Sequence, residues 1–245
     1  MTGAPAPVTT LEHRSRTPSR SWPVPVALVA LSAIPLTAGT LRLIQIAGGP
    51  ELMPVYDRFG AFPVAIVVHI IGAAVFALVG ILQFVPSIRR RHRAWHRRAG
   101  RVVAAAGLAV AGSALWLTLF YEPQPGTGDL LYVLRLLFVA AMTTCLVLGF
   151  TAIRRRDIAS HRAWMIRAYA LGLGAGTQPY TEGFGAAIFG DGVVAGDLAR
   201  GAAWFINLAI AEWVIRRPAR RRKRRQRQRR SPVPSTGTAV AGATQ

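Results

Sequence analysis

The chain has 245 residues, 52% of them hydrophobic, and a formal net charge of +20. Its apolar residues come in blocks of about 20, the length that a helix needs to cross a bilayer core of about 30 Å. A soluble domain, whose apolar residues recur at amphipathic spacing, is therefore excluded. The one cysteine, Cys145, excludes an intrachain disulfide and a cysteine-based metal site.

Six membrane spans are predicted along the chain. Residues 1–23 are polar, proline-rich and basic, which indicates a disordered cytoplasmic tail. The first span covers 24–46, where a cleavable signal peptide is the competing interpretation, but the run is too long and lacks a clear cleavage site. Five further spans are expected at 62–86, 102–121, 130–153, 165–186 and 198–215, which makes 24–215 one transmembrane domain. Because the apolar runs are continuous rather than alternating, the fold class is an all-α polytopic membrane protein and not a β-barrel.

The basic residues indicate how the chain is oriented. Four clusters hold 26 of the 30 Lys and Arg residues, and each adjoins the end of an apolar run: Arg14–Arg20, Arg89–Arg101, Arg154–Arg167 and Arg216–Arg230. The intervening loops near 47–61, 122–129 and 187–197 are acidic and carry one basic residue, Arg58. Because Lys and Arg accumulate on cytoplasmic loops, both termini are predicted to face the cytoplasm.

The C-terminal segment 216–245 is predicted to be a second disordered tail. Its first part, Arg216–Arg230, has eleven basic residues in fifteen positions. Binding of nucleic acid is not expected, because no aromatic residues are interleaved for base stacking. The predicted partners are the bilayer itself and anionic lipid headgroups at the basic tail.

A tetrapeptide, His-Arg-Ala-Trp, occurs twice, at His92–Trp95 and at His161–Trp164. Each copy lies where a basic loop meets an apolar run. A repeat of this kind predicts a duplicated helix–loop–helix unit, with the second and third spans as one hairpin and the fourth and fifth as the other. Because both loops are cytoplasmic, the two hairpins would be parallel and would form a four-helix core.

His69 lies within the second predicted span, where ionisable residues are rare and face the interior. Helical spacing places Gly72, Phe76, Gly80 and Gln83 on the same face. One interpretation is a ligand-binding or proton-handling histidine at a cavity. The other is a histidine that bonds to a neighbouring helix, with the glycines serving close packing.

Two further histidines, His96 and His161, begin the third and fifth spans at matching depth. They could ligate one haem iron from opposite faces. Alternatively, they bond to headgroups or loop carbonyls, and Trp164 anchors the chain at the interface, as aromatic residues at span ends commonly do. His92 is expected to be solvated.

The fifth span offers a second polar face, formed by Arg167, Gly174, Gln178 and Glu182. Arg167 lies near the cytoplasmic end, where anchoring at the interface is favoured. The same interpretation is favoured for the arginines expected near the outer surface, where Asp129 and Asp197 can offset two of them: Arg42, Arg135 and Arg200.

Taken together, the histidine, glycine and arginine motifs resemble those of a bacterial family of predicted membrane proteins, the domain of unknown function 2306. The resemblance covers roughly residues 62–186, and its pattern is His, Gly-x-x-Gln-Phe, His-Arg-x-x-Gly-Arg and His-Arg-x-Trp-Met-x-Arg. The matching residues are His69, Gly80, Gln83, Phe84, His96, Arg97, Gly100, Arg101, His161, Arg162, Trp164, Met165 and Arg167. The resemblance implies that His96, rather than His92, matches the histidine of the family pattern. It also implies that the protein lies in a bacterial cytoplasmic membrane. It implies no activity.

Three functions remain open from the sequence alone. No phosphate-binding loop, zinc motif or nucleophile elbow is present, which argues against an enzyme. The default is a noncatalytic integral membrane protein, such as a partner subunit or sensor. The alternatives are an electron-transfer protein with a b-type haem, held between the third and fifth spans or by His69, and a small-solute or proton transporter that uses the faces of His69 and Gln178.

Overall fold

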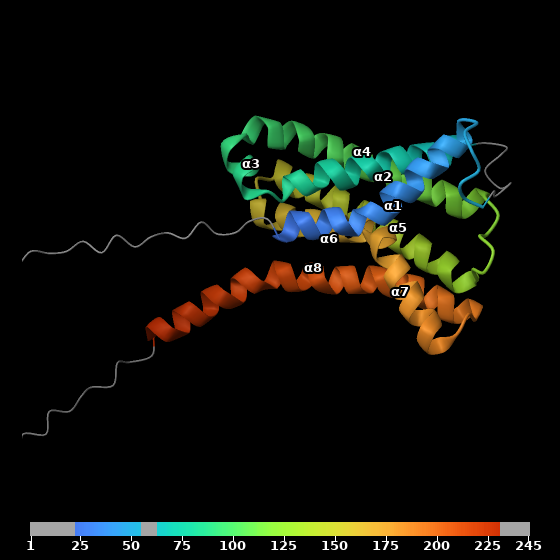
Figure 1. Cartoon of the computed structure of the whole chain (residues 1–245). Coiled ribbons are helices and arrows are strands. Elements are labelled where there is room, and N and C mark those ends of the chain that lie inside the picture. The colour runs from blue at the N-terminus through green and yellow to red at the C-terminus, as the bar shows by residue number, and fades with distance from the viewer. Residues whose placement is uncertain (1–22, 55–62, 231–245) are drawn as a thin grey trace, which may run out of the picture.

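The computed structural model describes residues 23–54 and 63–230, with side chains from 24 to 54 and from 63 to 217. Its helices are α1 (Pro23–Ile46), α2 (Val64–Gln83), α3 (Pro86–Arg91), α4 (Arg93–Phe120), α5 (Asp129–Arg154), α6 (Ile158–Gly172), α7 (Gly174–Phe189) and α8 (Val193–Arg230) (Figure 1). The all-α prediction is confirmed for these residues. The predicted N-terminal tail lies outside them apart from Pro23, as does 231–245. Helix α8 continues to Arg230, so the division of the chain into tails and a transmembrane domain stays a prediction.

Among the described residues, five helices are long and apolar enough to cross a membrane: α1, α2, α4, α5 and the Val193–Arg217 part of α8. The amino-acid composition of these helices explains why they are candidate spans. Helix α2, for example, contains no charged residue in twenty positions. Pro86 lies at the start of α3, where its missing N–H costs nothing, and the short helix α3 leads into α4. Helix α4 begins at Arg93, well before the predicted span at residue 102.

The predicted fifth span, 165–186, is not one continuous helix. The chain breaks at Leu173, between α6 with 15 residues and α7 with 16. Gly172 and Gly174 flank the break, and Pro179 lies inside α7, so the sequence here disfavours a continuous helix. At 1.5 Å per residue, α6 is about 22 Å long, too short to cross a core of about 30 Å. The described residues therefore contain five candidate spans and one broken segment, so the six predicted spans stay a prediction.

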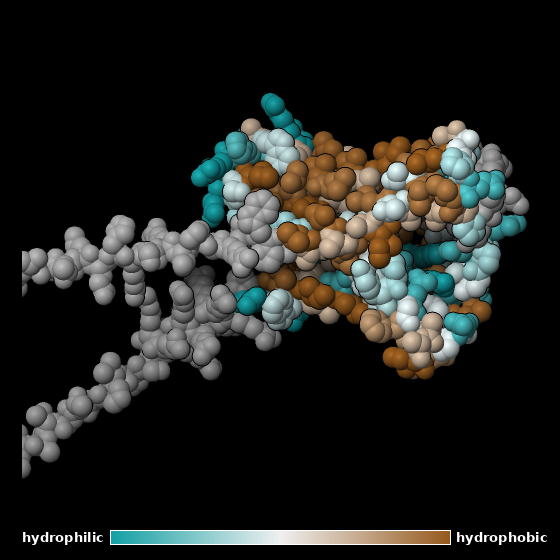
Figure 2. Space-filling model, in the orientation of Figure 1, coloured by the Kyte–Doolittle hydropathy of each residue, from teal (hydrophilic) through white to brown (hydrophobic). Residues whose placement is uncertain are grey.

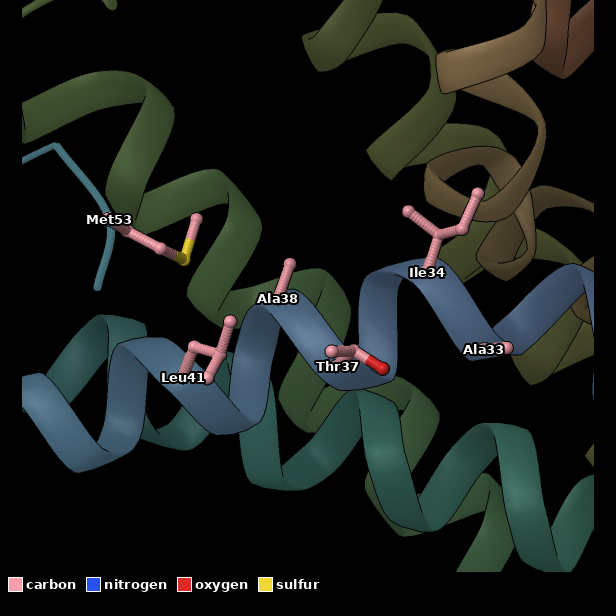
Figure 3. Close-up of a pocket in the computed structure, with 6 residues that line it drawn as sticks. All are labelled: Ala33, Ile34, Thr37, Ala38, Leu41 and Met53. Atoms are coloured by element: carbon pink, nitrogen blue, oxygen red, sulfur yellow. The ribbon is translucent and has the colours of Figure 1, made fainter.

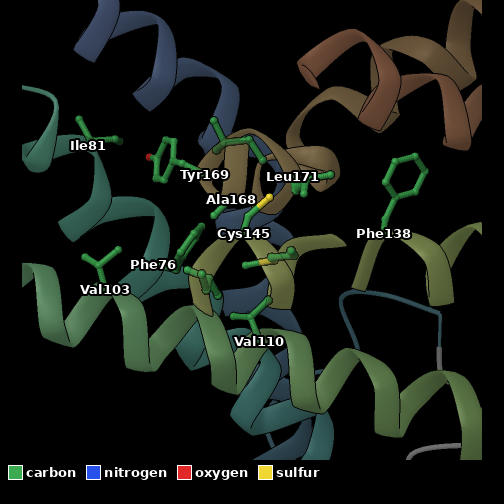
Figure 4. Packing of buried hydrophobic residues seen from close by; sticks show 12 residues of the cluster. Phe76, Ile81, Val103, Val110, Phe138, Cys145, Ala168, Tyr169 and Leu171 are labelled. Carbon is green, nitrogen blue, oxygen red and sulfur yellow. The ribbon is translucent and has the colours of Figure 1, made fainter. Parts of the chain in front are cut away.

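Helices α2, α4, α5 and α6 form a ring in which α2 contacts α4, α4 contacts α5, α5 contacts α6, and α6 contacts α2. The interior of the ring is filled by buried side chains such as Phe76, Val103, Val110 and Tyr169 (Figure 4). Helix α8 packs against α5, α6 and α7, and α1 packs against α2 and α7. Helix α2 packs against α4, and α5 packs against α6. The four-helix core of two parallel hairpins that was expected from the sequence stays a prediction.

On the face shown in Figure 2, hydrophobic side chains cover much of the middle of the bundle, and hydrophilic side chains gather toward its two ends. Large side chains such as Val102, Phe150 and Phe205 are half exposed, as expected of a surface that faces lipid. Lipid tails are as apolar as these side chains, so helices associate through close packing rather than hydrophobic burial. Gly107 permits such packing: a Cβ there would lie 2.7 Å from the ring of Phe76.

The two ends of the bundle differ in charge. The end of α2, helix α3, the start of α4 and the α5–α6 turn lie at the left in Figure 1, and we call this the basic end, residues 83–101 and 154–164. The loops after α1, α4 and α7 lie at the other end, which we call the opposite end: residues 47–54, 121–128 and 190–192.

Candidate functional site

His69 on α2 bonds to the neighbouring helix α4. Its Nδ1 lies 3.1 Å from Oγ of Ser113, and the Ser113 hydroxyl lies 2.7 Å from the carbonyl oxygen of Ala109 and 3.0 Å from that of Val110. Because the hydroxyl proton goes to a carbonyl, Ser113 Oγ accepts from His69 Nδ1–H. This contact supports the interpretation of His69 as a histidine that bonds to a neighbouring helix.

The face of α2 below His69 packs against α6. Gly80 lies under the ring of Tyr169, with which the Cβ of any larger residue would overlap. The Tyr169 hydroxyl donates to the carbonyl oxygen of Ala77 at 2.9 Å. Sequence reasoning found Gly80 but missed Tyr169. The signal was available, because a tyrosine inside an apolar span needs a partner for its hydroxyl.

At the basic end, Gln83 reaches α4. Its Oε1 lies 3.7 Å from where a Cβ of Gly100 would stand, and its Nε2 is buried with no hydrogen-bond partner among the described residues. His96 precedes Gly100 by one helical turn, on the same face of α4. Its Nδ1 is also buried without a partner among those residues. Gln83 therefore lies against Gly100, which follows His96 by one helical turn on α4.

His161 lies at the start of α6. Its Nδ1 donates to the carbonyl oxygen of Gly149 on α5 at 2.8 Å, which leaves Nε2 as an acceptor. Helices α4 and α6 occupy diagonal positions in the ring, so His96 and His161 belong to facing helices. They are close enough for an electrostatic interaction.

Haem ligation by His96 and His161 needs space for a porphyrin between α4 and α6. Deeper in the ring, the interior is filled by Ile81, Val103 and Tyr169, and Phe84 packs against this cluster. A porphyrin reaching past the basic end would displace these side chains. Haem binding stays a prediction, which a Soret band in purified protein would support.

The remaining motif arginines of the basic end are exposed, namely Arg97, Arg101 and Arg162. Their exposure fits contact with headgroups or water rather than with the interior.

Asp157, which caps α6, is exposed as well. It accepts from the Ser160 backbone N–H at 2.9 Å, and hydrogen bonds from Ser160 hold the pKa of the Asp157 carboxyl below its ordinary value.

Arg167 is not merely an interface anchor, as the sequence suggested. Its Nε lies 2.5 Å from Oε1 of Glu212 on α8, and Arg216 binds the other oxygen of Glu212 at 3.2 Å. The guanidinium carbon of Arg167 lies 4.6 Å from the ring centre of Trp164. This ion pair joins α6 to α8. The expected polar face shared by Arg167 and Gln178 is interrupted at Leu173, since Arg167 belongs to α6 and Gln178 to α7.

A buried asparagine supports the break between α6 and α7. Asn207 on α8, 8% exposed, donates from Nδ2 to the carbonyl oxygen of Ala170 at 3.1 Å. In a continuous helix this carbonyl would accept from residue 174. Thr177 donates to Oδ1 of Asn207 at 2.9 Å. Sequence reasoning did not single out Asn207; its signal was an amide within an apolar span.

Near the opposite end, Asp197 on α8 is 1% exposed and caps α5. It accepts from the backbone N–H groups of Gly128 and Leu131 at 3.0 and 3.1 Å. Sequence reasoning treated Asp197 only as a charge that offsets Arg200. Arg200 lies 3.8 Å from Asp197 and pairs more closely with Glu182 on α7, at 3.2 Å. These contacts join α5, α7 and α8.

Two depressions mark the surface. A shallow apolar groove runs along α1, lined by Ala33, Ile34, Thr37, Ala38, Leu41 and Met53 (Figure 3). Figure 2 shows a second hollow between α1 and the α7–α8 hairpin, toward the opposite end, with hydrophilic side chains inside it. The apolar groove suits a lipid tail, whereas the polar hollow suits water or a polar solute.

Comparison with known proteins places the chain in a family. The model of the family described as "Predicted membrane protein (DUF2306)" matches residues 66–215. No curated protein and no solved structure matches the chain. The matched range begins in α2 and ends in α8, so it includes both the basic-end site and the break after Leu173.

Proposed function

Because the chain belongs to the DUF2306 family of predicted membrane proteins, we propose that it acts within the bilayer as a noncatalytic protein that binds and passes a small polar solute. The observation that carries this proposal is the break between α6 and α7 together with its polar neighbour Asn207. The cytoplasmic membrane is the proposed location, with the basic end on the cytoplasmic side.

A broken helix supports this proposal for a physical reason. In lipid, every backbone N–H and C=O group needs a partner, so an interrupted helix is tolerated only beside polar protein groups or water. Asn207 meets this need at Ala170. Membrane proteins that carry solutes build their sites at interrupted helices of this kind. Thr177 and Gln178 follow the break on α7 and offer uncharged polar groups to a solute.

Ion pairs on both sides of the break support a path that closes at either end. Toward the basic end, Arg167 on α6 pairs with Glu212 on α8. Toward the opposite end, Glu182 on α7 pairs with Arg200 on α8. Both pairs join the broken segment to α8, and all four side chains remain partly exposed. Opening one pair while the other stays closed would admit a solute from one side.

Accessibility of the hollow to water is the first test. The chain has one cysteine, so Cys145→Ser provides a cysteine-free background. In that background Gln178→Cys should react with a membrane-impermeant maleimide added from the outer side. The matched control is Ala140→Cys, an exposed position in the middle of α5 that should face lipid and stay unlabelled. Equally slow labelling at both positions would contradict a water-filled path.

Solute passage is the second test. Proteoliposomes that contain the full chain are placed in an excess of glycerol or of urea, and reswelling is followed by light scattering. We expect faster reswelling than in protein-free vesicles for at least one of these solutes. Asn207→Leu should slow it, whereas Thr144→Ala, on the exposed side of α5, should not. Reswelling at the protein-free rate for both solutes would refute this form of the proposal.

A further inference from the structure

The basic end holds two buried polar atoms without partners among the described residues, Nε2 of Gln83 and Nδ1 of His96. They come from different helices, α2 and α4. Gln83 lies against Gly100, and His96 projects from the same face of α4 one turn away, so both side chains border one small region. A buried polar group without a partner is unfavourable, and such groups commonly mark a ligand that is not part of the protein chain.

The charges around this region define the kind of ligand. Residues 83–101 and 154–164 contain eleven arginines and one acidic residue, Asp157. Asp157 is occupied as the cap of α6. Arg89 and His161 act on His96 electrostatically. The surroundings therefore favour an anion, and the amide N–H groups of Gln83 require an acceptor oxygen.

We propose that Gln83 and His96 bind an oxygen of a phosphate group at the basic end, between α2 and α4. The Gln83 amide donates to this oxygen, and His96 donates from Nδ1. The neighbouring arginines hold the remaining charge of the phosphate. The phosphate belongs either to a free anion or to a lipid headgroup, since both reach this level of the membrane. This site is separate from the polar hollow beside α7.

The test uses the full chain in detergent without added phosphate, with inorganic phosphate as the first probe. The melting temperature of the wild-type protein should rise with phosphate in a saturable way, because the ligand binds the folded state. Gln83→Leu should weaken the response about tenfold, the typical loss for one hydrogen bond to a charged group. Chloride at the same ionic strength controls for screening.

A matched variant separates binding at the site from general attraction to arginine. His92→Phe removes an exposed histidine from the same basic segment and should respond to phosphate as the wild type does, whereas His96→Phe should not. Without phosphate, Gln83→Leu should be at least as stable as the wild type, because it replaces an unpartnered amide by an apolar group of similar size. If His96→Phe does not fold, Gln83→Leu still tests the proposal.

Phosphatidylglycerol added to the micelles is the second probe. If it raises the melting temperature of the wild type at lower concentration than that of Gln83→Leu, while inorganic phosphate has no effect, the ligand is a lipid headgroup. If inorganic phosphate acts and the lipid does not, the ligand is a free anion. Equal responses of wild type and Gln83→Leu to both probes, or no response to either, would overturn the proposal.

Discussion

The α2–α4–α5 part of the molecule and the α6–α7–α8 part are held together by different kinds of contact between helices. Helices α2, α4 and α5 are continuous, and apolar side chains and close-packed glycines dominate their contacts. Helices α6 and α7 are two pieces of one segment, and polar side chains join them to α8: Arg167 with Glu212, Ala170 with Asn207, and Glu182 with Arg200. Where each helix pairs its own backbone N–H and C=O groups, close packing is enough to join the helices. Where the backbone is interrupted, polar contacts between helices replace the missing bonds.

The largest loss of stability is expected at Asp197, because this residue of α8 caps α5 and so joins the two parts. Asp197→Ala removes the cap of α5 and leaves buried N–H groups at Gly128 and Leu131 without an acceptor. It should lower the free energy of unfolding by about 3 kcal/mol. Unfolding of detergent-solubilised protein measures this. Asp129→Ala, an exposed carboxylate in the first turn of α5, is the control and should change little; a similar loss in both variants would show that Asp197 has no special role.

Gly80 tests close packing in the first part. Gly80→Ala places a methyl group against the ring of Tyr169 and should cost about 2 kcal/mol through overpacking. Gly112→Ala is the control, because no atom lies within 4 Å of its Cβ position, and it should be neutral or stabilising. Thermal unfolding compares the two. Gly80→Ala combined with Tyr169→Leu should recover part of the loss, and no recovery would mean that the ring is not the obstacle.

Asn207 tests the polar support of the break. Asn207→Leu leaves the carbonyl of Ala170 without its donor and should cost about 1 kcal/mol. The effect should be local, so hydrogen exchange should become faster around residues 170–176 while α2 is unchanged. Uniformly faster exchange in both helices would indicate global destabilisation and contradict a local role. Thr177→Val, which keeps the Asn207 bond to Ala170, should have a smaller effect.

Asp157 should give the smallest effect, since it is fully exposed. Its pKa is lowered in the folded state, first by the Ser160 side chain and then by backbone hydrogen bonds. The contribution of Asp157 to stability is therefore present above its ordinary pKa of 3.8 and lost as the pH falls through the lower folded value. Hydrogen exchange at the start of α6 should accelerate over this range in the wild type. In Asp157→Asn this acid-dependent change should be absent.

Sequence reasoning found the features that depend on composition and local spacing. Long apolar runs predicted helices such as α2 and α5, because a bilayer requires about 20 apolar residues for each span. The motifs placed Gln83, His96 and His161 where the chain enters or leaves the apolar region, and the structure brings Gln83 close to Gly100 on α4. The family resemblance is confirmed by the match over residues 66–215.

Other features were missed because their partners lie far apart in the chain. Asp197 contacts residues 66 and 69 positions away, and Tyr169 bonds to a carbonyl 92 positions away. No local pattern reveals such pairs. The break after Leu173 had local signals in Gly172, Gly174 and Pro179, but the apolar average across the segment concealed them.

The sequence by itself determined that this chain is a helical membrane protein, because the hydrophobic length and the charge of each segment are local quantities. Local signals disfavour a continuous helix in the fifth apolar segment, but only the tertiary structure provides the partner for the break, because Asn207 of α8 supplies the bond that Ala170 loses. The tertiary structure also decided that Gln83 lies against Gly100 of α4, and that Nε2 of Gln83 and Nδ1 of His96 have no hydrogen-bond partner among the described residues. Hydrogen bonds between distant segments exist only once the helices have packed, so their presence or absence cannot be read from local spacing.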